Sequence, residues 1–135
     1  MNKKQESFLE RVDADLSTRG FPPSSILDLA QSLAVPPQAV KAILEIGTSH
    51  GVIVSLGSDL FYGRKQLRQI ASGLKDQAPP DGFDGAGFRA LTGLSRRLAD
   101  LLTFQLERLG YLERREGRLR FLNEPQAENP GEGYI

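Results

Sequence analysis

Residues 95–121, with the sequence SRRLADLLTFQLERLGYLERREGRLRF, decide the fold. After a serine suited to cap a helix, leucines recur with helical spacing, which predicts a helix from Ser95 to about Leu109. Its apolar stripe is formed by Leu98, Leu101, Leu102 and Leu106. Two short β-forming segments follow, 111–112 and 119–121, and they flank a turn at Arg115-Glu116-Gly117. The stretch therefore predicts a helix followed by a β-hairpin.

The same order of elements occurs 59 residues earlier in the chain. When Gly51 is aligned with Gly110, apolar residues coincide on both sides of the glycine. The coinciding pairs include Ile43 with Leu102, Ile53 with Leu112, Leu60 with Leu119, and Tyr62 with Phe121. An internal repeat of this kind indicates two similar structural units, each of about sixty residues.

Each unit starts with an amphipathic helix, predicted over residues 5–18 in the first and 64–75 in the second. Glycine and proline residues end these helices. A short second helix follows, capped by Ser24 or Ser25 in the first unit and lying around residues 88–91 in the second. A third helix precedes the hairpin in each unit, so the predicted order is helix, helix, helix, hairpin.

Three helices followed by a two-stranded hairpin are the outline of a winged helix, a variant of the helix-turn-helix. We therefore expect a mainly α protein with small β-hairpins (α+β), built from two tandem winged-helix domains. The first domain is predicted at residues 1–63 and the second at 64–123. Residues 124–135 contain prolines, glycines and three glutamates, which predicts a disordered acidic tail.

Composition argues against several classes of function. The chain has no cysteine and a single histidine, His50, so disulfides, thiol catalysis and zinc sites rich in Cys or His are not expected. We expect His50 to lie at a helix C-terminus and not to bind a metal. No acid/base pair is recognisable around Asp81, Asp84 and Glu107, so we expect neither an enzyme nor a cofactor. The absence of a long apolar run and of a signal peptide favours a cytoplasmic protein without a membrane partner.

The zero net charge of the chain hides a basic central region. Residues 64–123 carry twelve basic and seven acidic residues, a net charge of +5, whereas residues 1–63 carry −2 and the tail −3. Such an asymmetry suggests a polyanionic partner, above all a nucleic acid.

Arginines in the second unit stand where a phosphate would bind. Arg96 and Arg97 follow Ser95 in the first turn of a helix, where acidic residues are normally preferred and where an anion is favoured by the helix dipole. The candidate RNA-binding residues are Arg89, Ser95, Arg96, Arg97, Arg114, Arg115, Arg118 and Arg120. The corresponding positions of the first unit lack arginine, so we expect the second unit to bind and the first to support it.

The segment FRALTGLSRR at residues 88–97, with Leu102, residues 106–110 and Arg114, resembles the last winged helix of the bacterial selenocysteine-specific elongation factors, the SelB family. The first unit looks like the preceding winged helix of the same family. The resemblance implies an RNA partner, the selenocysteine insertion hairpin of an mRNA, and through it the ribosome indirectly. It also implies that Ser95, Arg96 and Arg97 contact the RNA backbone, with Arg114 nearby.

The resemblance further implies a GTPase elongation factor, but the chain has no P-loop pattern, so GTP binding is expected in a remainder outside it. Two other functions stay open from the residues alone. The tandem domains suit a double-stranded DNA-binding regulator that places helix 95–109 in the major groove, or a protein-interaction adaptor whose arginines meet an acidic partner.

Overall fold

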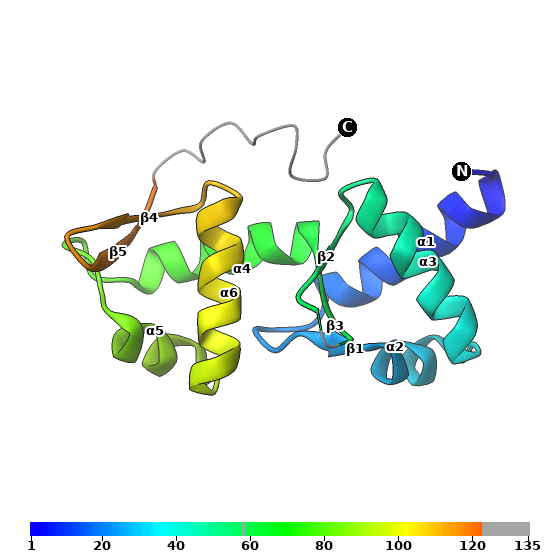
Figure 1. The fold of residues 1–135 in the computed structure, drawn as a ribbon, viewed down its shortest axis with the longest axis horizontal. Coiled ribbons are helices and arrows are strands. Elements are labelled where there is room, and N and C mark those ends of the chain that lie inside the picture. The colour runs from blue at the N-terminus through cyan, green and yellow to red at the C-terminus, as the bar shows by residue number, and fades with distance from the viewer. Residues whose placement is uncertain (58, 123–135) are drawn as a thin grey trace. The chain divides into compact units, whose positions relative to one another are not determined.

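The computed structural model describes residues 1–57 and 59–122 and is mostly helical, with small antiparallel sheets (Figure 1). This agrees with the expected α+β class. The chain divides into two compact units, Met1–Leu67 and a second that begins at Arg68. The division falls inside helix α4 (Arg64–Gln77), a few residues after the border predicted at residue 63. The predicted acidic tail at 124–135 lies outside the described residues.

Three helices and three short strands make up the first unit. They are α1 (Lys3–Ser17), β1 (Ser24–Ser25), α2 (Ile26–Leu33), α3 (Pro37–Ser49), β2 (Ile53–Ser55) and β3 (Leu60–Gly63). The strands form one antiparallel sheet in the order β1-β3-β2. Local sequence explains where α1 and α2 begin, because Asn2 and Ser25 each complete a capping box. Helix α3 begins with Pro37 in its first turn, where a proline costs no hydrogen bond.

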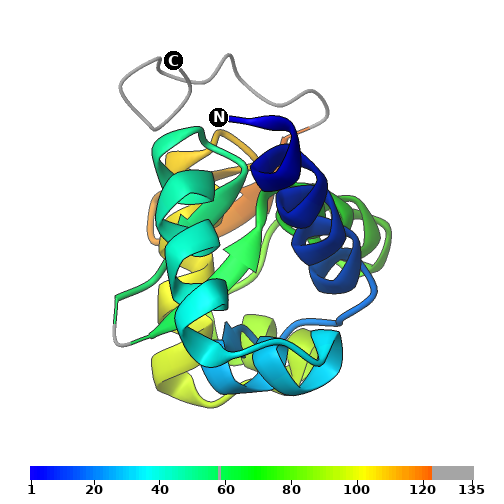
Figure 2. The same ribbon diagram turned by 90° about the vertical axis from the view of Figure 1, so that its right-hand side faces the viewer.

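The core of the first unit lies between its three helices and β2. Figure 2 shows α1 in dark blue and α3 in cyan on two sides of this unit, with α2 crossing below them. The buried residues are Leu9, Val12, Leu16, Leu29, Ala30, Val40, Ile43, Leu44 and Ile53. Close packing of α3 depends on Gly47, because a Cβ there would lie 2.6 Å from Ile53 Cγ1 and 2.8 Å from Leu9 Cδ1. A glycine therefore lets the helix approach both β2 and α1.

The second unit repeats the element order of the first. It contains most of α4, then α5 (Gly85–Thr92), α6 (Arg96–Arg108), β4 (Leu112–Arg115) and β5 (Arg118–Phe121). The bounds of α2 and α3 recur 59 residues later as the bounds of α5 and α6. The ends of α2 and α5 also correspond, since Ala34 and Gly93 both close their helix in the left-handed conformation. An isolated bridge between Phe83 and Leu119 stands where β1 pairs with β3 in the first unit.

The stripe of α6 that faces the core differs from the predicted one. Leu102 and Leu106 are fully buried as expected, but Leu98 and Leu101 are only half-buried. Ala99 and Leu109 complete the buried stripe instead. The reason is the helical period, because positions 99, 102, 106 and 109 lie on one face, whereas Leu98 and Leu101 both lie to the same side of it.

Candidate nucleic-acid interface

The N-terminus of α6 exposes two adjacent cationic side chains. Ser95 caps the helix, its Oγ accepting a hydrogen bond from Leu98 N at 3.3 Å. Arg96 and Arg97 are the first two helical residues, both are exposed, and the first turn contains no acidic residue. Within residues 1–57 and 59–122, neither guanidinium makes a hydrogen bond or an ion pair. The helix dipole and the free backbone N–H groups add to their positive potential, so this end of α6 is suited to an anion.

The other candidate arginines of the hairpin lie on its two opposite faces. Glu116 and Gly117 both have positive φ, of 52° and 76°, which makes a two-residue type I′ turn. In the resulting register, Glu113 lies opposite Arg120 and Arg115 opposite Arg118. Because side chains alternate along a strand, these four residues share one face of the hairpin. Arg114 points to the other face, which also carries Leu112, Leu119 and Phe121.

Carboxylates already neutralise part of this charge. Arg114 Nη2 donates to Glu107 Oε1 at 2.7 Å, which ties β4 to the last turn of α6. On the other face, Glu113 accepts a hydrogen bond from Arg120 and lies 3.9 Å from Arg115. All three arginine side chains remain at least half exposed. These are therefore surface ion pairs, which hold the side chains weakly and exchange with solvent ions.

Arg118 and Arg89 are placed differently from the exposed helix end. Arg118 Nη2 donates to the backbone carbonyl of Gly82 at 2.7 Å, so it supports the loop before α5. Arg89 is half-buried in the last turn of α5, and its Nη1 would lie 3.6 Å from a Cβ at Gly85. Both arginines therefore lie partly against the backbone of the second unit.

The candidate residues consequently form two clusters, the helix end and the hairpin. Figure 1 shows α6 running from its N-terminus, at the lower end, to the upper end where the chain enters β4. Arg96 and Glu107 are separated by eleven helical residues, which corresponds to about 16 Å along the axis. Since Glu107 binds Arg114, the helix-end arginines lie well away from that ion pair. A ligand that contacts both clusters must extend along much of α6.

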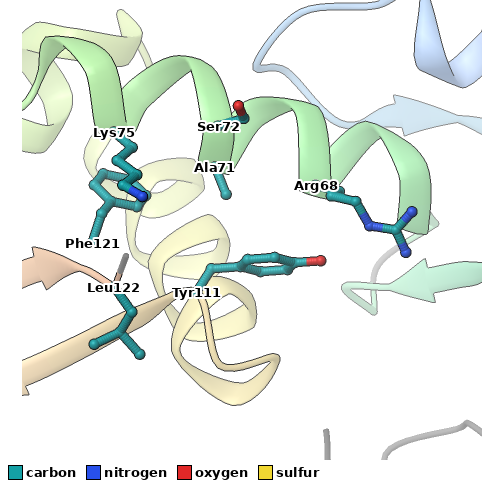
Figure 3. Close-up of a pocket in the computed structure, with 7 residues that line it drawn as sticks. All are labelled: Arg68, Ala71, Ser72, Lys75, Tyr111, Phe121 and Leu122. Atoms are coloured by element: carbon teal, nitrogen blue, oxygen red, sulfur yellow. The ribbon is translucent and has the colours of Figure 1, made fainter. Parts of the chain in front are cut away.

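Tyr111 and Phe121, the aromatic residues of the hairpin region, belong mainly to the interior of the second unit. Tyr111 is only 6% exposed, and the Phe121 ring packs 5.6 Å from the Phe83 ring. Both line a pocket of about 210 Å³ between α4 and the hairpin (Figure 3). Figure 3 shows Tyr111 extending beneath α4, with Phe121 and Lys75 at one end. Neither ring therefore offers a free face to a base.

The start of α3, which corresponds to the start of α6, carries no pair of basic residues. Pro36 and Pro37 stand at the start of α3, where α6 has Ser95 and Arg96. His50 is exposed at the C-cap of α3, as expected. In the part of the chain that the structure describes, no three His, Cys, Asp or Glu side chains cluster as metal ligands. No helix in that part is long and apolar enough to cross a membrane.

The fold of the chain has a counterpart among solved structures. The chain is similar to the mRNA-binding domain of elongation factor SelB from E. coli, solved in complex with SECIS RNA. The two share 21% identity with a TM-score of 0.59, over 91% of this chain and 100% of the other. The chain has a SelB-like winged-helix fold. No protein-family model and no curated protein matches it.

The carboxylate partners of the hairpin arginines and the exposure of Phe104 on α6 were not predicted from the sequence. The pair between Glu113 and Arg120 could have been found by counting outward from a two-residue turn at Glu116-Gly117, because the register then places them opposite each other. The pair between Glu107 and Arg114 has no such signal, since it depends on how the hairpin packs against α6.

Proposed function

We propose that this chain is the RNA-binding, C-terminal tandem winged-helix region of a selenocysteine-specific elongation factor. In this proposal the second domain, 64–123, grips the selenocysteine insertion hairpin of an mRNA, and the first domain, 1–63, supports it. The protein acts in the cytoplasm by binding, with neither an enzymatic reaction nor a cofactor of its own. The GTPase remainder of the factor and, indirectly, the ribosome are the other proposed partners.

The observation that carries this proposal is the pair Arg96 and Arg97 at the exposed N-terminus of α6. Two adjacent guanidinium groups at the positive end of a helix dipole repel each other, and no carboxylate of the first turn offsets them. A phosphate relieves this repulsion, because it accepts hydrogen bonds from both guanidinium groups and from the backbone N–H groups. The similarity to the SelB domain in complex with SECIS RNA supports RNA as the source of that phosphate.

A hairpin suits the geometry better than a long duplex. The deep, narrow major groove of A-form RNA does not admit a helix, so proteins read RNA mainly at loops, bulges and backbone shape. The N-terminus of α6 presents one group of charges, and the hairpin that follows the other end of this helix presents Arg115, Arg118 and Arg120 on its outward face. Two separated cationic clusters fit the backbone on either side of a loop.

The proposal is tested by fluorescence anisotropy with a labelled RNA hairpin, beside a DNA duplex of the same stem sequence. We expect the chain to prefer the RNA hairpin and to lose affinity as salt rises. The double variant Arg96→Ala/Arg97→Ala should bind at least about tenfold more weakly, and its salt dependence should fall by about one to two phosphate contacts. A matched control is Lys3→Ala/Lys4→Ala, which removes two exposed charges from the first turn of α1.

Three results would contradict the proposal. If both nucleic acids bind equally weakly and the arginine variant behaves like the wild type, the tandem domains are better explained as a protein-interaction adaptor. If the DNA duplex binds more tightly than the hairpin, a DNA-binding regulator is favoured. Equal losses in the arginine and lysine variants would assign the binding to overall charge and not to the α6 terminus.

A further inference from the structure

Phe104 lies in the middle of the solvent-facing side of α6 with 61% of its surface exposed. Two other phenylalanines of the second unit, Phe83 and Phe88, are buried and stack on each other with their ring centroids 5.8 Å apart. A large ring that does not join this core loses the favourable free energy that burial would contribute. An exposed aromatic residue of this size suggests a surface that is covered by a partner.

The surroundings of Phe104 identify the kind of partner. Phe104 lines a shallow hollow on the surface together with four other residues of α6, namely Arg96, Arg97, Asp100 and Leu101. The ring and Leu101 supply apolar area, and the two arginines supply positive charge beside it. An acidic protein could meet the arginines, but the combination of an exposed aromatic face with adjacent guanidinium groups is the one by which proteins bind single-stranded nucleic acid.

The spacing along α6 is compatible with one short stretch of strand. Arg97 precedes Phe104 by seven residues, two helical turns, so both side chains lie on the same side of the helix about 10 Å apart along its axis. A phosphate held at Arg97 and a base lying on the Phe104 ring can therefore belong to neighbouring nucleotides. Asp100 lies one turn before Phe104 and disfavours a second phosphate at that position, because its carboxylate would repel it.

We propose that Phe104 is a stacking platform for one unpaired base of the bound RNA, with the backbone of that strand held by Arg96 and Arg97. This inference rests on the proposed function, from which it takes the RNA. It adds a contact made with a base, whereas the arginines contact phosphate.

The experiment compares Phe104→Ala, Phe104→Leu and Phe104→Tyr with the wild type on the same labelled hairpin. Loss of a stacked base is expected to weaken binding about tenfold in the alanine and leucine variants, whereas tyrosine keeps a π-face and binds like the wild type. The salt dependence should not change, because no phosphate contact is removed. A hairpin with 2-aminopurine at each loop position in turn should show one position whose fluorescence is quenched by the wild type and not by Phe104→Leu.

Leu27→Ala is the matched control, because Leu27 is a similarly exposed apolar residue, 63% exposed, on α2 of the first unit. It should bind the hairpin like the wild type. Thermal unfolding of every variant checks that the fold is kept, which is expected since each replaced side chain is largely in solvent.

The outcomes separate this inference from the proposed function. If the wild type binds the hairpin in a salt-dependent way and Phe104→Ala binds equally well, the stacking platform is wrong and the proposed function stands. If Phe104→Leu binds like the wild type while Phe104→Ala does not, the contact is apolar and stacking is again refuted. If the wild type does not bind RNA, the proposed function fails first and the inference fails with it.

Discussion

Glu113 on β4 accepts a hydrogen bond from Arg120, the residue directly opposite it on β5. The same carboxylate lies 3.9 Å from Arg115, two residues further along its own strand. One acidic side chain thus lies among three arginines on the outward face of the hairpin, and it lowers the positive potential there. The hairpin and the end of α6 consequently differ: in the described residues each hairpin arginine has a carboxylate or carbonyl partner, whereas Arg96 and Arg97 have none.

We therefore expect Glu113→Gln to strengthen RNA binding. The substitution keeps the shape of the side chain and removes one negative charge, which leaves Arg115 and Arg120 free to contact phosphate. Affinity for the RNA hairpin should rise severalfold and the salt dependence should become steeper by up to about one phosphate contact. Stability should change by less than about 1 kcal/mol, since surface ion pairs contribute little. Glu45→Gln, at an exposed position of α3, is the control, and an equal gain in both variants would refute a specific role for Glu113.

Variants of Ser95 separate its capping role from RNA contact. Because Ser95 Oγ accepts from Leu98 N, Ser95→Ala should cost about 1 kcal/mol of stability in urea denaturation. Ser95→Asn and Ser95→Asp both restore a cap and should recover that stability. Only the aspartate adds a negative charge beside Arg96 and Arg97, so it should weaken RNA binding while asparagine should not. Weak binding by the asparagine variant would instead indicate that the serine hydroxyl itself contacts RNA.

Gly82 is expected to be intolerant of a side chain. Its φ is +95°, and a Cβ would lie 2.8 Å from the carbonyl oxygen of Leu119. Gly82→Ala should therefore destabilise the second unit by about 1–3 kcal/mol, through backbone strain and a clash with β5. Gly73 provides the contrast, because it lies within α4 and has open space around its Cα. Gly73→Ala should stabilise the protein by about 0.5–1 kcal/mol, and a loss of similar size in both variants would contradict the argument.

Ionisation of Tyr62 is expected to lower the stability of the folded protein at alkaline pH. The buried hydroxyl donates to the carbonyl of Phe21 at 2.5 Å, and burial raises the pKa of Tyr62 well above its ordinary value of 10.0. The folded state therefore favours the neutral phenol. This contribution is complete below pH 10 and is lost as pH rises from about 10 towards the folded pKa, because the unfolded chain ionises first.

Tyr62→Phe removes both the hydrogen bond and this titration. At pH 7 the variant should be less stable than the wild type by about 1 kcal/mol. Above pH 10 the difference should shrink, since only the wild type loses stability by ionisation of this group. Urea denaturation at several pH values between 7 and 11 measures the two curves, and a constant difference across that range would show that Tyr62 does not titrate as described.

Patterns of neighbouring residues determined the order of the helices and hairpins. Apolar spacing, caps and turn residues act over a few positions, so the 59-residue repeat of α2 and α3 as α5 and α6 was visible without a structure. The two residues at the start of α6 that carry most of the proposed function, Arg96 and Arg97, were recognised for the same reason. Their place follows from the helix that Ser95 caps.

Tertiary structure alone decided which of the candidate arginines are already engaged. Arg114 meets Glu107 because the hairpin packs against the last turn of α6, and Arg118 reaches the carbonyl of Gly82, 36 residues away. The exposure of Phe104 was decided in the same way, by which face of α6 turned to the core. The sequence by itself determined the local elements, because their free energy depends on residues close along the chain. The partners of Arg114 and Arg118 and the exposure of Phe104 were decided only by folding, because they depend on residues that no local preference brings together.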